Sequence, residues 1–165
     1  RGKEKPGDID ILVLFKTSVD KEIEYKIRKE IEKKYKKISI ISKTETTLSD
    51  PAFDARESIL FEGKSLVKER TIAEQYGYNS FGMFKYYFTG WDKLQKTKYY
   101  YALNGRSGEK GIAKELGCIK LADGVILVPL TKIEEFRDFI ESWKLEYLFI
   151  PTLIPERLNK KSILE

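Results

Sequence analysis

Two aspartates at the start of an apolar stretch are the residues in this sequence with the clearest capacity for chemistry. Asp8 and Asp10 lie two positions apart, so in an extended strand both side chains point to the same face. Like charges so placed repel each other, and a divalent cation is the natural counter-charge. Gly7, immediately before the pair, leaves room for a ligand to approach the backbone. The spacing predicts a metal site; the alternative is an exposed acidic pair at a strand end, neutralised by nearby lysines.

The composition limits which chemistry this pair can perform. The 165-residue chain contains no histidine and one cysteine, Cys118. Ser-His-Asp and Cys-His catalysis are therefore excluded, as are zinc sites built from histidines or from cysteine clusters. Any metal must be held by oxygen ligands, which favours Mg²⁺ or Mn²⁺ bound together with phosphates. The formal net charge of +5 mildly favours a phosphate-bearing partner.

The sequence also predicts a folded, cytoplasmic protein. Its 41% hydrophobic and 13% aromatic residues provide enough apolar material for a packed core. No run approaches the roughly 18 uncharged apolar residues that span a bilayer, since the longest candidate, residues 9–15, contains Asp10. The first six residues lack the apolar segment of a secretory signal, and Cys118 has no partner for an intramolecular disulfide. We therefore expect no membrane association.

The elements that would position the acidic pair are a strand, a helix and a second strand. Residues 9–15 form an apolar run typical of a strand buried on both faces. Thr17-Ser18-Val19-Asp20 matches a capping box before a helix with apolar residues every four positions, and residues 38–42 predict the second strand. Further on, the sequence predicts a helix capped by Ser49 and ended by Gly63, then a short edge strand at residues 65–67.

The segment from Arg1 to Val13 resembles the nucleotide-binding segment of the minimal nucleotidyltransferases within the DNA polymerase β superfamily. Arg1-Gly2 matches the Arg-Gly that ends a short helix in that family, Gly7 occupies a position often held by serine, and Asp8-Ile9-Asp10 matches the acidic pair. The Gly-Ser that begins the family's helix would fall before Arg1. We therefore expect the printed chain to start inside the domain, without its first helix and strand. The resemblance extends to about residue 68.

The resemblance implies both a reaction and a site. The reaction is magnesium- or manganese-dependent transfer of a nucleoside monophosphate to an acceptor hydroxyl, with ATP as the expected triphosphate substrate. The metal would be held by Asp8 and Asp10. The nucleotide would lie against the preceding loop, at Arg1, Gly2, Lys3 and Gly7. As an alternative, Arg1 and Lys3 are ordinary surface residues.

One position departs from the family pattern. Catalytic members carry a third carboxylate on the strand after the connecting helix, where this chain has Ser39. A hydroxyl cannot deprotonate an attacking alcohol or hold a metal as a carboxylate does. Either Glu45, further along the same segment, substitutes as a catalytic residue, or catalysis is weak or lost. The alternative function is a catalytically weak or inactive nucleotide- or DNA-binding regulator, similar to an antitoxin.

The second half of the chain predicts a different kind of module. The expected elements are helices at 91–103 and 111–116, a hairpin of residues 118–121 and 125–128, a helix at 133–143, a strand at 145–150 and a loose tail from 155. Helix, turn, helix and hairpin is the order of a winged helix. Such a module would contact DNA phosphates through Arg106, Lys110, Lys114 and Lys120, although acids share the region. The alternatives are a module that binds a protein and one that serves only in packing.

Together these patterns predict an α+β fold in two domains. Residues 1–68 would form a nucleotidyltransferase-type mixed sheet with flanking helices. Residues 69–165 would form an aromatic-rich, winged-helix-like α/β module with a polar tail. The expected function is nucleotidyl transfer, with the regulator as the alternative.

Overall fold

The computed structural model describes residues 9–35 and 37–159. Within these ranges the protein is α+β, with a two-stranded parallel sheet and a four-stranded antiparallel sheet. The chain forms two compact units, Arg1–Glu57 and Ser58–Glu165, whereas the sequence predicted a boundary between residues 68 and 69. The boundary in the structure lies nearer the N-terminus because Phe61 packs in the core of the second unit. No helix in the described ranges is long and apolar enough to cross a membrane.

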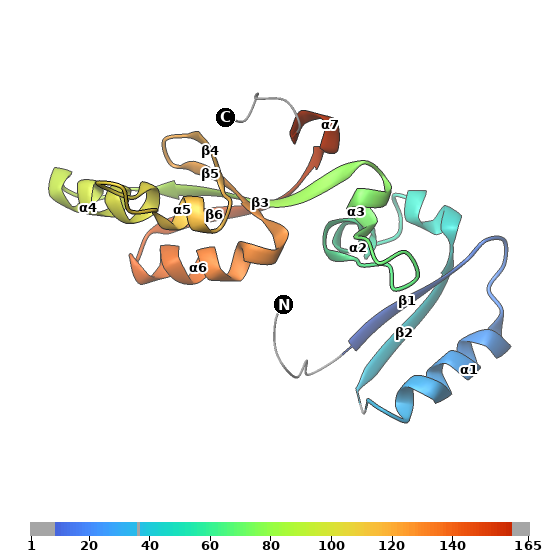
Figure 1. Cartoon of the computed structure of the whole chain (residues 1–165). Helices are drawn as coiled ribbons and strands as arrows, with labels where there is room; N and C mark the ends of the chain where they lie inside the picture. Colours follow the sequence, from blue (N-terminus) through green and yellow to red (C-terminus); the bar gives the residue numbers. More distant parts are fainter. Residues whose placement is uncertain (1–8, 36, 160–165) are drawn as a thin grey trace. The chain divides into compact units, whose positions relative to one another are not determined.

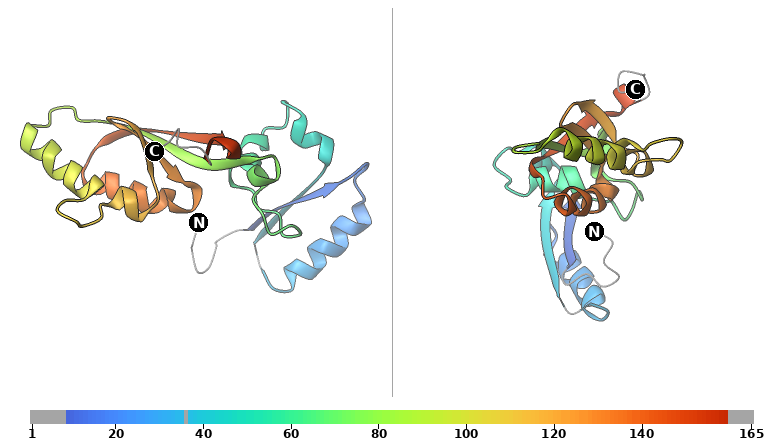
Figure 2. Two further views of the ribbon diagram at one scale, coloured as in Figure 1. Left: turned by 45° about the horizontal axis from the view of Figure 1, so that its top comes forward. Right: turned by 90° about the vertical axis from the view of Figure 1, so that its left-hand side faces the viewer.

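The first unit is built on a strand–helix–strand motif, as the sequence predicted. β1 (Ile9–Phe15) and β2 (Ile38–Thr44) run parallel, and α1 (Lys21–Glu32) connects them and packs beside them (Figures 1 and 2). A parallel pair needs such a crossover, because the chain must return to the same end of the sheet. The ladder pairs Ile9 with Ile38 and continues in register to Phe15 and Thr44. Ile40, in the middle of β2, is buried.

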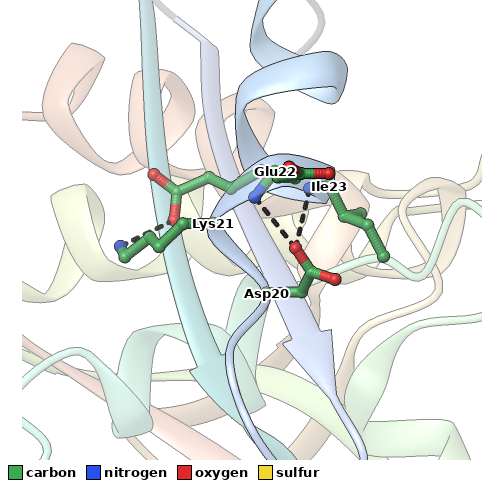
Figure 3. A network of polar contacts seen from close by, with 5 residues as sticks. Asp20, Lys21, Glu22 and Ile23 are labelled. Carbon is green, nitrogen blue, oxygen red and sulfur yellow. Dashed lines mark hydrogen bonds and ion pairs between the residues drawn. The ribbon is translucent and has the colours of Figure 1, made fainter.

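α1 begins at a cap formed by Asp20. Its Oδ1 atom accepts hydrogen bonds from the backbone N–H groups of Glu22 and Ile23, at 2.8 and 3.1 Å (Figure 3). The expected capping box beginning at Thr17 is therefore wrong, since the helix starts three residues later with Asp20 itself as the cap. An aspartate in this position satisfies amide groups that have no partner within the helix, and its charge complements the helix dipole.

Replacing Asp20 by alanine should lower the free energy of unfolding of the first unit by about 1 kcal/mol, because two amides lose their acceptor. Urea denaturation followed by circular dichroism measures this. Asp20→Asn retains the acceptor oxygen and should retain most of the stability. Equal losses in the two variants would show that the charge, rather than the cap, is what stabilises the helix.

The segment after β2 differs from the expected long helix. A 3₁₀ helix, η1 (Glu45–Ser49), comes first, and α2 (Arg56–Glu62) begins only after several turns. Asp50 Oδ1 accepts from the amide of Ala52 at 2.9 Å, so this side chain stabilises a turn where the sequence predicted a helix start. The edge strand expected at residues 65–67 is also wrong. Leu66 and Val67 are 83% and 93% exposed in a turn, and only the flanking Lys64 and Thr71 form an isolated bridge.

The second unit is organised around an antiparallel sheet with the strand order β4-β5-β3-β6. Its elements are α3 (Ile72–Gln75), β3 (Tyr78–Tyr87), α4 (Lys93–Asn104), α5 (Ile112–Glu115), β4 (Ile119–Ala122), β5 (Val125–Pro129), η2 (Leu130–Lys132), α6 (Ile133–Ser142), β6 (Glu146–Pro155) and α7 (Glu156–Asn159). The two helices, the hairpin, the third helix and the last strand follow in the predicted order. The hairpin turns at Gly124, whose φ of 78° suits glycine.

β3 was not predicted, although it is the central strand that holds the sheet together. It pairs with β5 on one side and β6 on the other. Gly82 lies within it, and a Cβ atom there would come within 2.6 Å of the Phe149 ring and 3.0 Å of Ile133. The absence of a side chain at Gly82 thus lets a ring and a helix pack closely against the strand.

The core of the second unit lies between one face of this sheet and α6 (Figures 1 and 2), and α4 adds the buried side chains of Tyr99 and Leu103. Phe84 of β3 and Phe136 of α6 are fully buried, with an edge-to-face contact and ring centroids 5.0 Å apart. β6 continues to Pro155, beyond the expected end at Pro151. This is tolerated because β6 is an edge strand, so a proline need not donate to a neighbour on its outer side. The tail expected to be loose from residue 155 begins with a short helix, α7.

Candidate functional site

The structure places Asp10 directly beside Ser39. They are register partners in the parallel ladder of β1 and β2, so their Cα atoms lie about 5 Å apart, the usual distance between neighbouring strands. Register partners present their side chains to the same face of a sheet. Ser39, which departs from the nucleotidyltransferase pattern, therefore lies next to Asp10, the member of the acidic pair that the structure describes.

This shared face is open within the first unit. Asp10 and Ser39 are both exposed, whereas Ile40, which points the opposite way, is buried. Ser42, two residues after Ile40, points to the same side as Ile40, and its hydroxyl is close enough to Glu24 of α1 to influence that carboxyl, which identifies the face covered by the helix. The nearby Ser42 hydroxyl, followed by the Lys21 ammonium at 3.0 Å, lowers the pKa of the Glu24 carboxyl. A ligand can therefore reach Asp10 and Ser39 from the side of the sheet away from α1.

The remaining residues of the expected loop lie outside the described residues. These are Arg1, Gly2, Lys3, Gly7 and Asp8. The pairing of Asp8 with Asp10, and the nucleotide contacts of the loop, therefore stay predictions. Regular pairing already begins at Ile9, whose amide donates to the carbonyl of Lys37 at 3.1 Å.

Glu45 does not lie at the end of the β1–β2 ladder where Asp10 and Ser39 are paired. It is the first residue of η1, after the end of β2, whereas Ser39 is near the beginning of that strand. Five strand residues, 40–44, lie between the two positions, and the six steps from residue 39 to residue 45 correspond to roughly 20 Å at about 3.3 Å per residue. Glu45 thus lies at the opposite end of the ladder from Asp10, and the structure offers no support for it as a substitute carboxylate.

Lys37 is a residue at this edge that the motif did not reveal. It directly precedes β2, it is exposed, and its backbone accepts the first hydrogen bond of the ladder. Its sequence position, two before Ser39, indicates the same face if the strand alternation continues. The pairing of β1 with β2 places Lys37 at the same end of the ladder as Asp10, although the two residues are far apart in the sequence.

The oxygen ligands that the structure describes at this end of the β1–β2 ladder suit a hard cation. They are one carboxylate, Asp10, and one hydroxyl, Ser39, and oxygen ligands of this kind bind Mg²⁺ or Mn²⁺. Among residues 9–35 and 37–159 no group of three or more acidic, cysteine or histidine side chains is placed to hold a metal. A metal at this edge would therefore depend on Asp8 and on the phosphates of a nucleotide, which is how Mg²⁺ commonly binds.

The only cysteine does not provide an alternative site of chemistry. Cys118 is partly buried in the second unit, and burial raises the pKa of its thiol to about 12. The thiol is therefore protonated at neutral pH and is a poor nucleophile.

Comparison with known proteins adds no relative to these observations. No protein-family model matches the chain, and no curated protein or solved structure matches it either. The resemblance to nucleotidyltransferases rests on the residues described above.

Proposed function

We propose that the first unit is a nucleotidyltransferase-type domain that binds Mg²⁺ or Mn²⁺ and a nucleoside triphosphate, with ATP the expected one. The observation that supports this best is the parallel β1–α1–β2 arrangement, which presents Asp10 on an open face at the beginning of an apolar strand. Asp8, by the same alternation, would add the second carboxylate. The nucleotidyltransferase-type mixed sheet itself is part of this proposal.

The reaction would be attack by an acceptor hydroxyl on the α-phosphate, forming a new phosphate ester and releasing pyrophosphate. The bound metal would supply Lewis-acid stabilisation of the charge that develops on the phosphate oxygens. Asp8 and Asp10 would hold the nucleotide through that metal and orient its α-phosphate. Lys37 would add a positive charge at the phosphates, and the Ser39 hydroxyl would donate a hydrogen bond at the same edge.

The proton of the acceptor hydroxyl has no evident base among the described residues at this edge. Ser39 is a weak base, and Glu45 lies at the other end of the ladder. We therefore propose slow transfer, and this same observation favours a second candidate function. In that alternative, the domain binds a nucleotide and acts as a regulator with little or no catalysis.

Calorimetric titration of ATP into the full chain tests the proposal, with Mg²⁺ present and with chelator. Binding that requires Mg²⁺ is expected in both candidates. Incubation with α-³²P-labelled ATP then separates them, because label transferred to the chain or to an added hydroxyl acceptor indicates an enzyme. Absence of metal-dependent binding would contradict both.

The winged-helix interpretation of the second unit also remains a proposal. The helix–turn–helix–hairpin order supports it, with α4, α5 and the β4–β5 hairpin in sequence. The hairpin, however, is half of a four-stranded sheet that includes β3 and β6.

A further inference from the structure

One side of α4 combines an aromatic ring, an apolar side chain and positive charge. Leu94, Lys98 and Tyr101 are spaced by four and three residues, so they line one face of the helix. All three are exposed, Leu94 to 62% and Tyr101 to 44%. The twelve residues of α4 include three lysines and no acid. This face therefore offers a stacking surface beside uncompensated positive charge.

Arg106 extends this surface beyond the end of the helix. The carbon of its guanidinium lies 4.6 Å from the centroid of the Tyr101 ring. A guanidinium stacked on one face of a ring leaves its N–H groups free to bind phosphate, and the second face of the ring free to stack. Of the ion pairs recorded between described residues, none includes Lys98 or Arg106.

The turn that carries Arg106 is fixed by close backbone packing. Gly105 ends α4 with a φ of 89°, and a Cβ atom on Gly105 or on Gly111 would overlap backbone atoms of the opposite side of the turn. Such positions require glycine. Arg106 is therefore held at the end of α4 by a tight loop rather than by its own side-chain contacts alone.

Charge is distributed unevenly over the second unit. Residues 92–123 contain seven lysines and arginines against four acids, whereas residues 124–159 contain four against six. The positive charge therefore gathers on the segment of α4, α5 and β4. A partner with regularly spaced negative charges is favoured on that segment and disfavoured on the rest.

We propose that α4 binds single-stranded nucleic acid, with one base stacked on Tyr101 and the flanking phosphates at Lys98 and Arg106. Exposed aromatic rings among cations are typical of single-strand binding, because every unpaired base offers a flat face. A duplex keeps its bases stacked on one another, and α5, with four residues, is too short to read a major groove as a recognition helix does. The inference concerns the second unit alone and does not depend on the nucleotidyltransferase proposal.

Fluorescence anisotropy of the full chain with labelled oligo(dT) and oligo(U) of about 12 nucleotides tests this, at low salt and with a matched duplex as competitor. Tyr101→Ala should weaken binding roughly 5- to 100-fold, while Tyr101→Phe should preserve it because the ring remains. Arg106→Gln should lower the slope of log affinity against log salt by about 0.7.

Tyr87→Ala is the matched control. Tyr87 is 43% exposed in the same unit and has Lys85 over its ring at 5.4 Å, yet it lies on β3 rather than on α4. The Tyr87→Ala variant should bind the oligonucleotides as tightly as the unmodified chain does. The proposal is overturned if the unmodified chain binds neither oligonucleotide at low salt, if the duplex binds more tightly, or if Tyr87→Ala weakens binding as much as Tyr101→Ala.

Discussion

Replacing Asp8 and Asp10 by asparagine should abolish the metal-dependent component of triphosphate binding, with an affinity loss of about 100-fold or more. Two charged contacts to a cation, each contributing about 1.5–3 kcal/mol, correspond to a loss of that size. Asparagine keeps the shape of aspartate and removes its charge, so the fold of β1 should be retained. Calorimetry of ATP binding with Mg²⁺ and with chelator measures the effect.

The matched control for this pair is Asp54→Asn combined with Glu57→Gln. Asp54 and Glu57 are exposed acids of the same unit, outside β1 and β2, so replacing both changes the net charge by the same two units. A general effect of net charge would change the affinity to the same extent in both variants, whereas a local site would lose metal-dependent binding only when Asp8 and Asp10 are replaced. If metal-dependent binding of the triphosphate survives the double substitution, Asp8 and Asp10 do not form the metal site.

Ser39→Asp should increase nucleotide transfer, by about tenfold or more. The substitution places a second carboxylate beside Asp10 in the register of the ladder, where it can act as a base for the acceptor and as a metal ligand. A positioned base typically contributes about 10²- to 10⁴-fold, and an introduced one recovers part of that range. Rates of label transfer from α-³²P-labelled ATP measure the gain.

A stability measurement separates a new metal site from a general effect of Ser39→Asp. Two adjacent carboxylates on one face of a sheet destabilise it by up to about 1 kcal/mol when no cation is present. The variant should therefore have a lower melting temperature than the unmodified chain in chelator, and Mg²⁺ should raise it. Ser39→Asn, which lacks the charge, should show neither effect.

Glu45→Gln decides between the interpretations that the sequence left open. The distance of Glu45 from Asp10 along the ladder predicts no change in transfer. A loss of transfer in this variant would mean that Glu45 does supply the missing carboxylate. If neither Ser39→Asp nor Glu45→Gln alters transfer, the catalytic proposal fails and the regulator takes its place.

The sequence predicted best those elements that depend on neighbouring residues. β1, α1 and β2 follow from an apolar run, a period of four and a second apolar run, and the β4–β5 hairpin follows from Asp123-Gly124. Local patterns of this kind contain most of the information needed for single helices and hairpins. Where two local signals competed, as at Thr17 and Asp20, the boundary was misplaced by a few residues.

Features set by distant contacts were not predictable in the same way. β3 was not predicted because glycine within a strand normally weakens it, yet Gly82 is required here because Phe149, far along the chain, packs against it. For the candidate site, the motif predicted Asp10 and identified Ser39 as the departure. The strand register pairs Ser39 with Asp10 and shows that Lys37 lies at the same end of the ladder, whereas Glu45 lies at the other end.

The placement of β3 between β5 and β6 has a consequence for how the protein is made. β6 follows every other strand in the sequence, yet it forms the whole of one side of the β3 ladder. During synthesis the α4–β5 region emerges early and can form local contacts, whereas one edge of β3 remains unpaired until residue 155 has been added. A nascent chain halted before Glu146 would leave the backbone N–H and C=O groups of that edge unpaired and accessible to other chains. Rapid completion of translation, or a chaperone on the emerging strand, would therefore protect this protein from aggregation.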